Sequence, residues 1–148
     1  MPLQLQLDLR VALRRPLLPS KAVEALLDLG PDGVIREIES GRLEWAWDIR
    51  SPDAAKRDLR VWAPCVRHFM DGVFAPIAGD PYAAILPATR AVWRGTDLQR
   101  LFTCSETHIT HLLDAGELTA LNPQRARTIS AEIPRLAVLN FLLKRRLT

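Results

Sequence analysis

Residues 96–118 read TDLQRLFTCSETHITHLLDAGEL, and this stretch decides the fold that the sequence predicts. Its apolar residues recur at helical spacing in two runs, which a short turn separates. Thr96 and Ser105 are suited to cap the starts of the two helices, and Gly116 is suited to end the second one. The stretch therefore predicts two helices joined by a tight turn, with Leu118 opening a strand.

The chain contains an earlier version of this pattern, in which residues 34–43 read VIREIESGRL. When the sequence is shifted on itself by 75 positions, Gly41 falls on Gly116 and Leu43 on Leu118. Apolar residues also coincide along both helices: Val23 with Leu98, Leu26 with Leu101, Val34 with Ile109, and Ile38 with Leu113. A self-match of this kind indicates a duplicated supersecondary unit.

Each copy of the helical pair is followed by a predicted β-hairpin and a further helix. Apolar and polar residues alternate over 43–49 and return over 59–63, and a short helix passes through Cys65 and Phe69. In the second copy the strands are predicted at 118–121 and 127–129, before a final helix over 135–146. Residues 3–11 also alternate and predict an N-terminal strand.

These elements predict an α+β chain with three parts. A first unit covers residues 1–70, a connector 71–95 and a second unit 96–148. The connector is rich in Gly, Pro and Ala, but its apolar content and a helical turn expected from Asp80-Pro81 indicate that it packs against the protein.

Composition excludes several classes of protein. No apolar run is long enough to cross a membrane, and the segment MPLQLQLDLRV lacks the pattern of a signal peptide, so we expect a cytoplasmic protein without a membrane partner. Residues 1–74 hold 11 Lys/Arg and 11 Asp/Glu, whereas residues 75–148 hold 9 and 6, so the second half carries the whole net charge of +3. A modestly basic half is compatible with phosphate binding but does not require it.

The second copy resembles a known family. The run TDLQRLFTCSETHITHLLDAGELTAL, followed by RTIS and VLNFLLKRR, is similar to the winged helix-turn-helix of the excisionase and MerR-related DNA-binding proteins. The resemblance covers residues 96–146 well and residues 20–70 weakly, through the repeat. It implies two tandem winged helix-turn-helix units with small hairpin wings.

The resemblance implies a DNA-binding surface on helix 105–115, which would enter a major groove. The residues it assigns to DNA binding are Ser105, Glu106, Thr107, His108, Thr110 and His111 on this helix, with Arg100, Arg125 and Arg127 as phosphate contacts. Double-stranded DNA is the expected partner. A second copy of the chain, as a homodimer or filament, and a recombinase are further expected partners. The implied role is control of recombination on a mobile element, or transcriptional regulation.

A protein-interaction adaptor is the alternative function. Glu106 stands where the family often has a basic or hydroxyl residue. DNA phosphates repel a carboxylate at this position unless the carboxylate accepts a hydrogen bond from a cytosine amine. The first unit offers a poor base-reading surface, because Pro31-Asp32-Gly33 opens its second helix and Arg36, Glu37 and Glu39 nearly balance. In this alternative both units have lost DNA binding, and the Trp-rich hairpin of the first unit binds another protein.

A zinc-dependent form is a third interpretation, because Cys104, His108 and His111 lie near one helix edge and a residue of the pair Cys65 and His68 could complete a four-ligand set. The spacing matches no common zinc template, so we predict no metal and no cofactor. Cys104 is then a small apolar residue in the turn.

Two other groups have more than one interpretation. Trp45, Trp47 and Trp62 form either a core or dimer interface, which we favour, or a stacking platform for single-stranded nucleic acid. Lys144-Arg145-Arg146 is either a solvated helix end or a phosphate contact. Catalysis is not expected, because the sequence has no phosphate-binding loop, nucleophile elbow, HExxH motif or Ser/His/Asp arrangement.

Overall fold

The computed structural model describes residue 3, residues 11–122 and residues 127–147. Within them the protein is α+β, as predicted, with short antiparallel strands and helices of up to three turns. The first unit contains β1 (Leu17–Pro19), α2 (Ser20–Leu27), α3 (Pro31–Glu39), β2 (Ala46–Asp48), β3 (Leu59–Trp62) and α4 (Ala63–Met70). After α5 (Pro81–Ile85), the second unit contains β4 (Val92–Arg94), α6 (Gly95–Phe102), α7 (Glu106–Asp114), the 3₁₀ helix η1 (Thr128–Ser130), β5 (Glu132–Pro134), α8 (Arg135–Arg145) and β6 (Arg146–Leu147).

The two units repeat the same order of elements. The strand β4 and the helices α6 and α7 begin and end 75 residues after β1, α2 and α3. In each unit the first strand pairs antiparallel with the strand before the last helix, so that Leu18 lies opposite Val61 and Trp93 opposite Ile133. The structural repeat therefore has the same offset as the repeat of apolar residues in the sequence.

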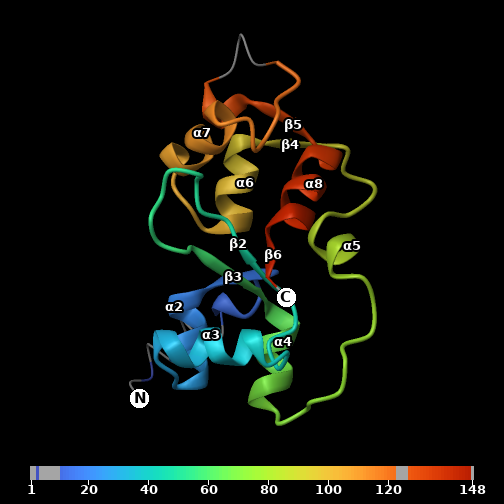
Figure 1. Ribbon diagram of the computed structural model, residues 1–148. Coiled ribbons are helices and arrows are strands. Elements are labelled where there is room, and N and C mark those ends of the chain that lie inside the picture. The colour runs from blue at the N-terminus through green and yellow to red at the C-terminus, as the bar shows by residue number, and fades with distance from the viewer. Residues whose placement is uncertain (1–2, 4–10, 123–126, 148) are drawn as a thin grey trace.

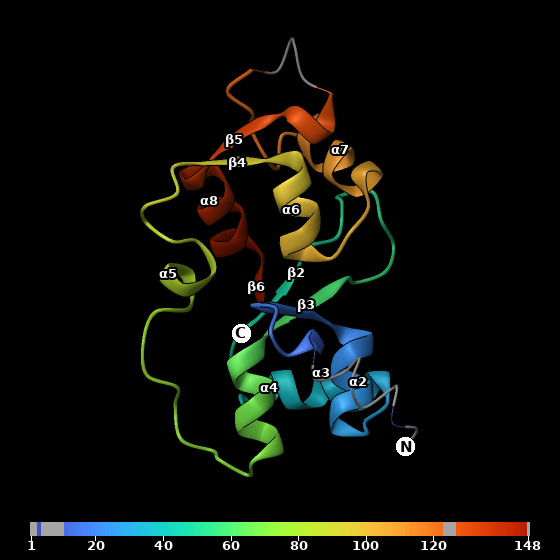
Figure 2. The ribbon, with the colours of Figure 1, turned by 180° about the vertical axis from the view of Figure 1, so that it is seen from behind.

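The two units are joined through the last strand. The order of strands in the larger sheet is β1-β3-β2-β6, so a strand that follows α8 completes the sheet of the first unit. Figures 1 and 2 show β6 descending from α8 to lie beside β2, with the second unit above the first. Both units also contribute to one continuous cluster of buried apolar residues.

The connector packs against the protein, as predicted. Asp80 caps α5 by accepting a hydrogen bond from the Tyr82 amide at 3.0 Å. The Tyr82 ring meets Trp45 and Trp47 edge-on at centroid distances of 5.7 and 6.0 Å. Ile85 is buried, so the turn that follows Asp80 is part of the core.

The helix ends follow the predicted signals at some positions. Pro31 occupies the first turn of α3, and Gly41 and Gly116 follow α3 and α7 with φ of 85° and 77°. Ser20 and Thr96, however, do not cap helices. The helices start at or before these residues, and the Asp97 carboxylate accepts the free Arg94 amide at 2.9 Å instead.

The second hairpin differs from the prediction. Residues 118–121 form no regular strand, and the predicted return strand is replaced by η1, with β5 following it. A backbone bond from the Leu121 amide to the Glu132 carbonyl remains, at 2.6 Å. The Asn122 side chain accepts the Glu132 amide at 2.9 Å. The Thr96 hydroxyl donates to the Ile129 carbonyl at 2.8 Å and holds η1 against α6.

Of the predicted N-terminal strand over residues 3–11, the structure describes only Leu3 and Val11, and both are helical instead of extended; residues 4–10 lie outside the described part of the chain. Among the helices that the structure does describe, none is long and apolar enough to cross a bilayer.

Candidate nucleic-acid interface

Helix α7 follows α6 after a turn that two residues define. Thr103 adopts a left-handed conformation with φ of 50° at the end of α6. Ser105 then caps α7, because its hydroxyl accepts the His108 amide at 3.1 Å. The predicted capping role of Ser105 is therefore confirmed, and the turn fixes the direction in which α7 leaves α6.

One face of α7 is buried and the opposite face is open to solvent. Ile109 and Leu112 are fully buried against the core. The residues on the other side are exposed, and we call them the α7 face: Glu106, Thr107, His111 and Asp114. Helical spacing places 107, 111 and 114 on one line, which shows that Asp114, absent from the predicted site, belongs to the same surface.

Thr110 lies at one edge of the α7 face. Its hydroxyl contacts the Thr128 hydroxyl of η1 at 2.5 Å and donates to the Glu106 carbonyl at 3.0 Å. Thr110 is only half-exposed, so it holds η1 beside the helix more than it presents a free hydroxyl.

His108 lies at the other edge and faces the first unit. Its Nε2 is 2.6 Å from the Ile49 carbonyl oxygen, and its Nδ1 is 3.7 Å from an Asp58 carboxylate oxygen. Both ring nitrogens are therefore directed at the loop between β2 and β3. This placement corrects the expectation that His108 lies on the exposed face, since the sequence repeat gave no sign that the first unit packs against this side.

The predicted phosphate contacts are exposed where the structure describes them. Arg100 on α6 and Arg127 before η1 are both open to solvent. Arg125 lies outside the described residues. Arg15 of the first unit, which the sequence did not suggest, donates to the Thr103 hydroxyl at 2.9 Å and so stands beside the turn that leads into α7.

Two of the three basic residues at the end of α8 fit neither earlier interpretation, because they contact the protein itself. Arg145 pairs with Glu117 at 3.2 Å and donates to the Arg50 carbonyl at 2.7 Å. The Arg146 guanidinium lies 3.5 Å from the centroid of the Trp45 ring. Lys144 alone keeps an exposed side chain, 72% accessible, so most of this basic run joins the two units.

The tryptophans are core residues. Trp47 is fully buried and Trp62 is 6% exposed, and Trp45 stacks on Trp47 at a centroid distance of 6.3 Å. A stacking platform for single-stranded nucleic acid needs open ring faces, which this packing does not provide. The favoured interpretation of the cluster as core is therefore confirmed for Trp47 and Trp62.

The cysteines are separate and protonated. Burial raises the pKa of Cys65 and of Cys104 to about 11, although Arg60 opposes the shift at Cys104. Among the described residues no three His, Cys, Asp or Glu side chains converge as metal ligands. Cys104 is half-buried in the turn, which fits the expected role of a small apolar residue there.

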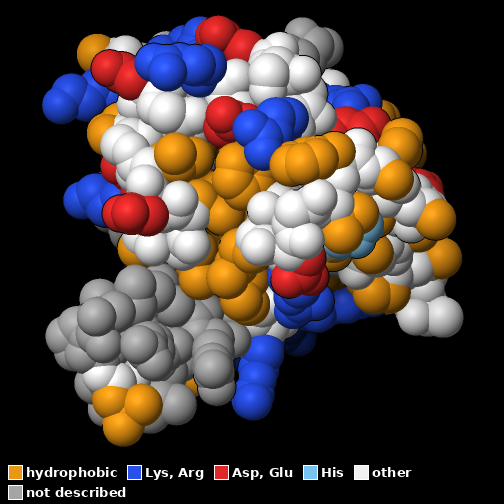
Figure 3. All heavy atoms as spheres, turned by 90° about the horizontal axis from the view of Figure 1, so that it is seen from below, with side chains coloured by type: hydrophobic (Ala, Val, Ile, Leu, Met, Phe, Trp, Pro, Cys, Tyr) orange, Lys and Arg blue, Asp and Glu red, His pale blue; other side chains and the backbone are white. Residues whose placement is uncertain are grey.

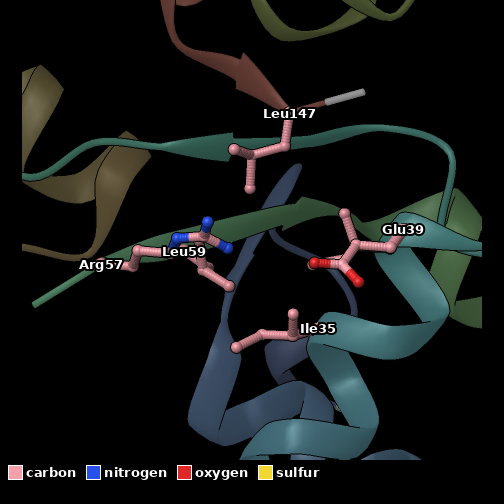
Figure 4. A pocket seen from close by; sticks show the side chains of 6 residues that line it. Ile35, Glu39, Arg57, Leu59 and Leu147 are labelled. Atoms are coloured by element: carbon pink, nitrogen blue, oxygen red, sulfur yellow. The ribbon is translucent and has the colours of Figure 1, made fainter.

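The equivalent surface of the first unit has a different character. Seen from below in Figure 3, positive, negative and apolar side chains are interspersed on this end of the molecule. Beside α3 there is a small hollow, where Glu39 and Arg57 flank an apolar wall that includes Ile35 and Leu147 (Figure 4). The repeat aligns Ile35 of α3 with Thr110 of α7. With Leu147 of β6 beside it, this position is more apolar in the first unit than in the second.

Comparison of the chain with protein-family models, with curated proteins and with solved structures gives no match.

Proposed function

We propose that this chain binds double-stranded DNA without catalysis, through a winged helix-turn-helix in its second unit. The observation that carries the proposal is the placement of α7. The helix is capped by Ser105, held on α6 by Ile109 and Leu112, and presents Thr107 and His111 on an open face. A helix supported in this way has the geometry that major-groove reading requires.

In this proposal the residues have distinct roles. Thr107 and His111 contact base edges, and Glu106 accepts from a cytosine amine. Arg100 and Arg127 contact phosphate, together with Arg125 and the rest of wing 122–127, along the backbone or in the adjacent minor groove. Ser105, His108 and Thr110 orient the helix, as their hydrogen bonds indicate.

The resemblance to excisionases supports a role in controlling site-specific recombination with a recombinase, or in transcriptional regulation. A single reading helix makes few contacts, so we expect the chain to bind as a homodimer or a filament.

Selection of binding sites from random duplexes, followed by fluorescence anisotropy, tests the proposal. Thr107→Ala/His111→Ala should weaken binding to the selected site at least tenfold, because it removes two base contacts. The matched control is Asp32→Ala/Arg36→Ala, which changes the corresponding positions of α3 and should leave affinity unchanged. Equal affinity of both double variants would show that α7 is not the reading helix.

The adaptor alternative rests on a different surface from the one first expected. The Trp-rich hairpin is buried, but Leu136 and Leu143 on α8 are 63% and 53% exposed, and Glu106 and Asp114 make the α7 face partly acidic. DNA binding weakens steeply as salt rises from about 50 to 200 mM, whereas an apolar protein interface barely responds. The salt dependence of complex formation therefore separates the two functions.

A further inference from the structure

We infer that the first unit supplies a second wing to the α7 site, so that Lys56 and Arg15 contact DNA phosphates beside the helix. The loop between β2 and β3, residues 49–58, is the element concerned, and we call it the first-unit loop. This inference rests on the proposed function and extends it to the unit whose own second helix offers a poor base-reading surface.

The first observation is that α7 lies between two loops. On the Thr110 side, η1 of its own unit contacts the helix through Thr128. On the His108 side, the first-unit loop contacts it through the Ile49 carbonyl and Asp58. Both Figure 1 and Figure 2 show this loop reaching up from the larger sheet to the region of α7. A duplex seated on the α7 face would therefore meet a loop on each side.

The second observation is that the first-unit loop is held in place from inside the protein. Arg60, only 5% exposed, donates to the carbonyls of Phe102 and Thr103, the latter at 3.1 Å. The same side chain pairs with Asp58 at 2.5 Å. One buried guanidinium thus ties the end of the loop to the turn that precedes α7.

A further set of bonds fixes the start of the loop. Asp48 accepts the amides of Arg50 and Asp58, each at 3.1 Å, and so closes the loop across its base. From α8, Arg145 donates to the Arg50 carbonyl. A loop fixed at both ends loses little conformational freedom on binding, which favours its use as a contact surface.

The third observation is the position of the cations. Lys56 is exposed and lies two residues before Asp58, which contacts His108. Arg15 is exposed and hydrogen-bonded to Thr103, two residues before the Ser105 cap. Arg57, in contrast, lines the hollow beside α3 (Figure 4). Arg15 therefore lies beside the turn that leads into α7, and Lys56 belongs to the loop that contacts this helix.

Salt dependence of binding measures these contacts. Lys56→Gln and Arg15→Gln should each lower the slope of log K against log salt by about 1 and weaken binding about fivefold near 0.15 M salt, without changing the preferred sequence. Lys56→Arg and Arg15→Lys keep the charge and should keep the slope. Arg36→Gln removes the same charge from exposed α3 and serves as the matched control.

The outcomes separate this inference from the proposed function. If the selected duplex binds, Thr107→Ala/His111→Ala abolishes binding and neither Gln variant changes the slope, the second wing is ruled out while the reading helix stands. A lower slope in either Gln variant, with the Arg36 control unchanged and thermal unfolding unaltered, supports a contribution from the first unit. If the wild-type chain selects no duplex, both ideas fail together.

Discussion

A single glycine decides how closely two parts of the second unit approach. Gly95 opens α6 at the position where Ser20 opens α2, and a Cβ at Gly95 would overlap the Thr128 carbonyl oxygen of η1. In the first unit the corresponding residue is Ser20, which has a side chain, and the hairpin runs as the regular strands β2 and β3. The repeat alone therefore could not reveal why the two positions differ.

Replacing Gly95 by Ser should lower the free energy of unfolding by about 3 kcal/mol, because backbone rather than a flexible side chain must move. Gly30→Ser adds the same atoms before α3, where nothing lies within 4 Å, and should be neutral or stabilising through capping. Urea denaturation of both variants measures the difference. Similar values for the two would mean that η1 is not packed on Gly95 in solution.

The Asp97 carboxylate gives α6 a pH-dependent start. Partial burial alone would raise its pKa, but the Arg94 amide and the Arg90 guanidinium outweigh this and hold the pKa below its usual value. A carboxylate with a lowered pKa stabilises the fold above about pH 4, and this stability is lost as pH falls through the folded-state pKa.

Asp97→Asn should therefore cost about 1 kcal/mol at pH 7 and less near pH 3, where the stabilisation by the charge begins to be lost. Denaturant titrations of variant and wild type at the two pH values provide the comparison. A cost that is the same at both would assign the effect to shape and not to charge.

At the scale of elements, the helices were predictable and the second hairpin was not. Spaced apolar residues, Ser105 and the two terminating glycines act locally, so they predicted α3, α6, α7 and α8 closely. The backbone conformation of residues 118–134 depends on packing against α6, and a local sequence pattern cannot predict such packing. The candidate site was predictable to the same extent. Thr107 and His111 are exposed as expected, whereas the position of His108 is set by its contacts with the first unit.

The contact of His108 makes a testable difference between neighbouring residues of α7. His108→Ala should lower the free energy of unfolding by about 1–2 kcal/mol, because the hydrogen bond to the Ile49 carbonyl is lost. Thr107→Ala, one residue away on the exposed face, should change it by less than about 0.5 kcal/mol. Equal effects would indicate that α7 does not dock on the first-unit loop.

At the scale of the whole molecule, the two units share a core and a buried cation. Arg60 satisfies carbonyls at the end of α6 from its place on β3, and Phe102 meets Phe141 at a centroid distance of 5.8 Å within the same cluster. The sequence predicted two units joined by a connector, because periodicity reports what each helix buries but not which partner covers it.

Arg60→Met should lower the free energy of unfolding by about 3 kcal/mol, because the carbonyls of Phe102 and Thr103 lose their donor. Arg36→Met on the surface is the control for Arg60→Met.

Wild type should unfold in a single transition by tryptophan fluorescence and by circular dichroism, since both units contribute to one core. Two separate transitions in the wild-type chain would contradict a shared core.

The β6 strand also has a consequence for how the chain acquires its shape during synthesis. Ala46 of β2 pairs with Leu147 of β6, so the outer edge of β2 stays unpaired until about a hundred further residues have been made. Until then the nascent first unit carries an unprotected strand, which is open to pairing with other chains. Translation of the second unit thus covers the edge of β2, and a ribosome paused before residue 146 would leave this edge exposed to aggregation.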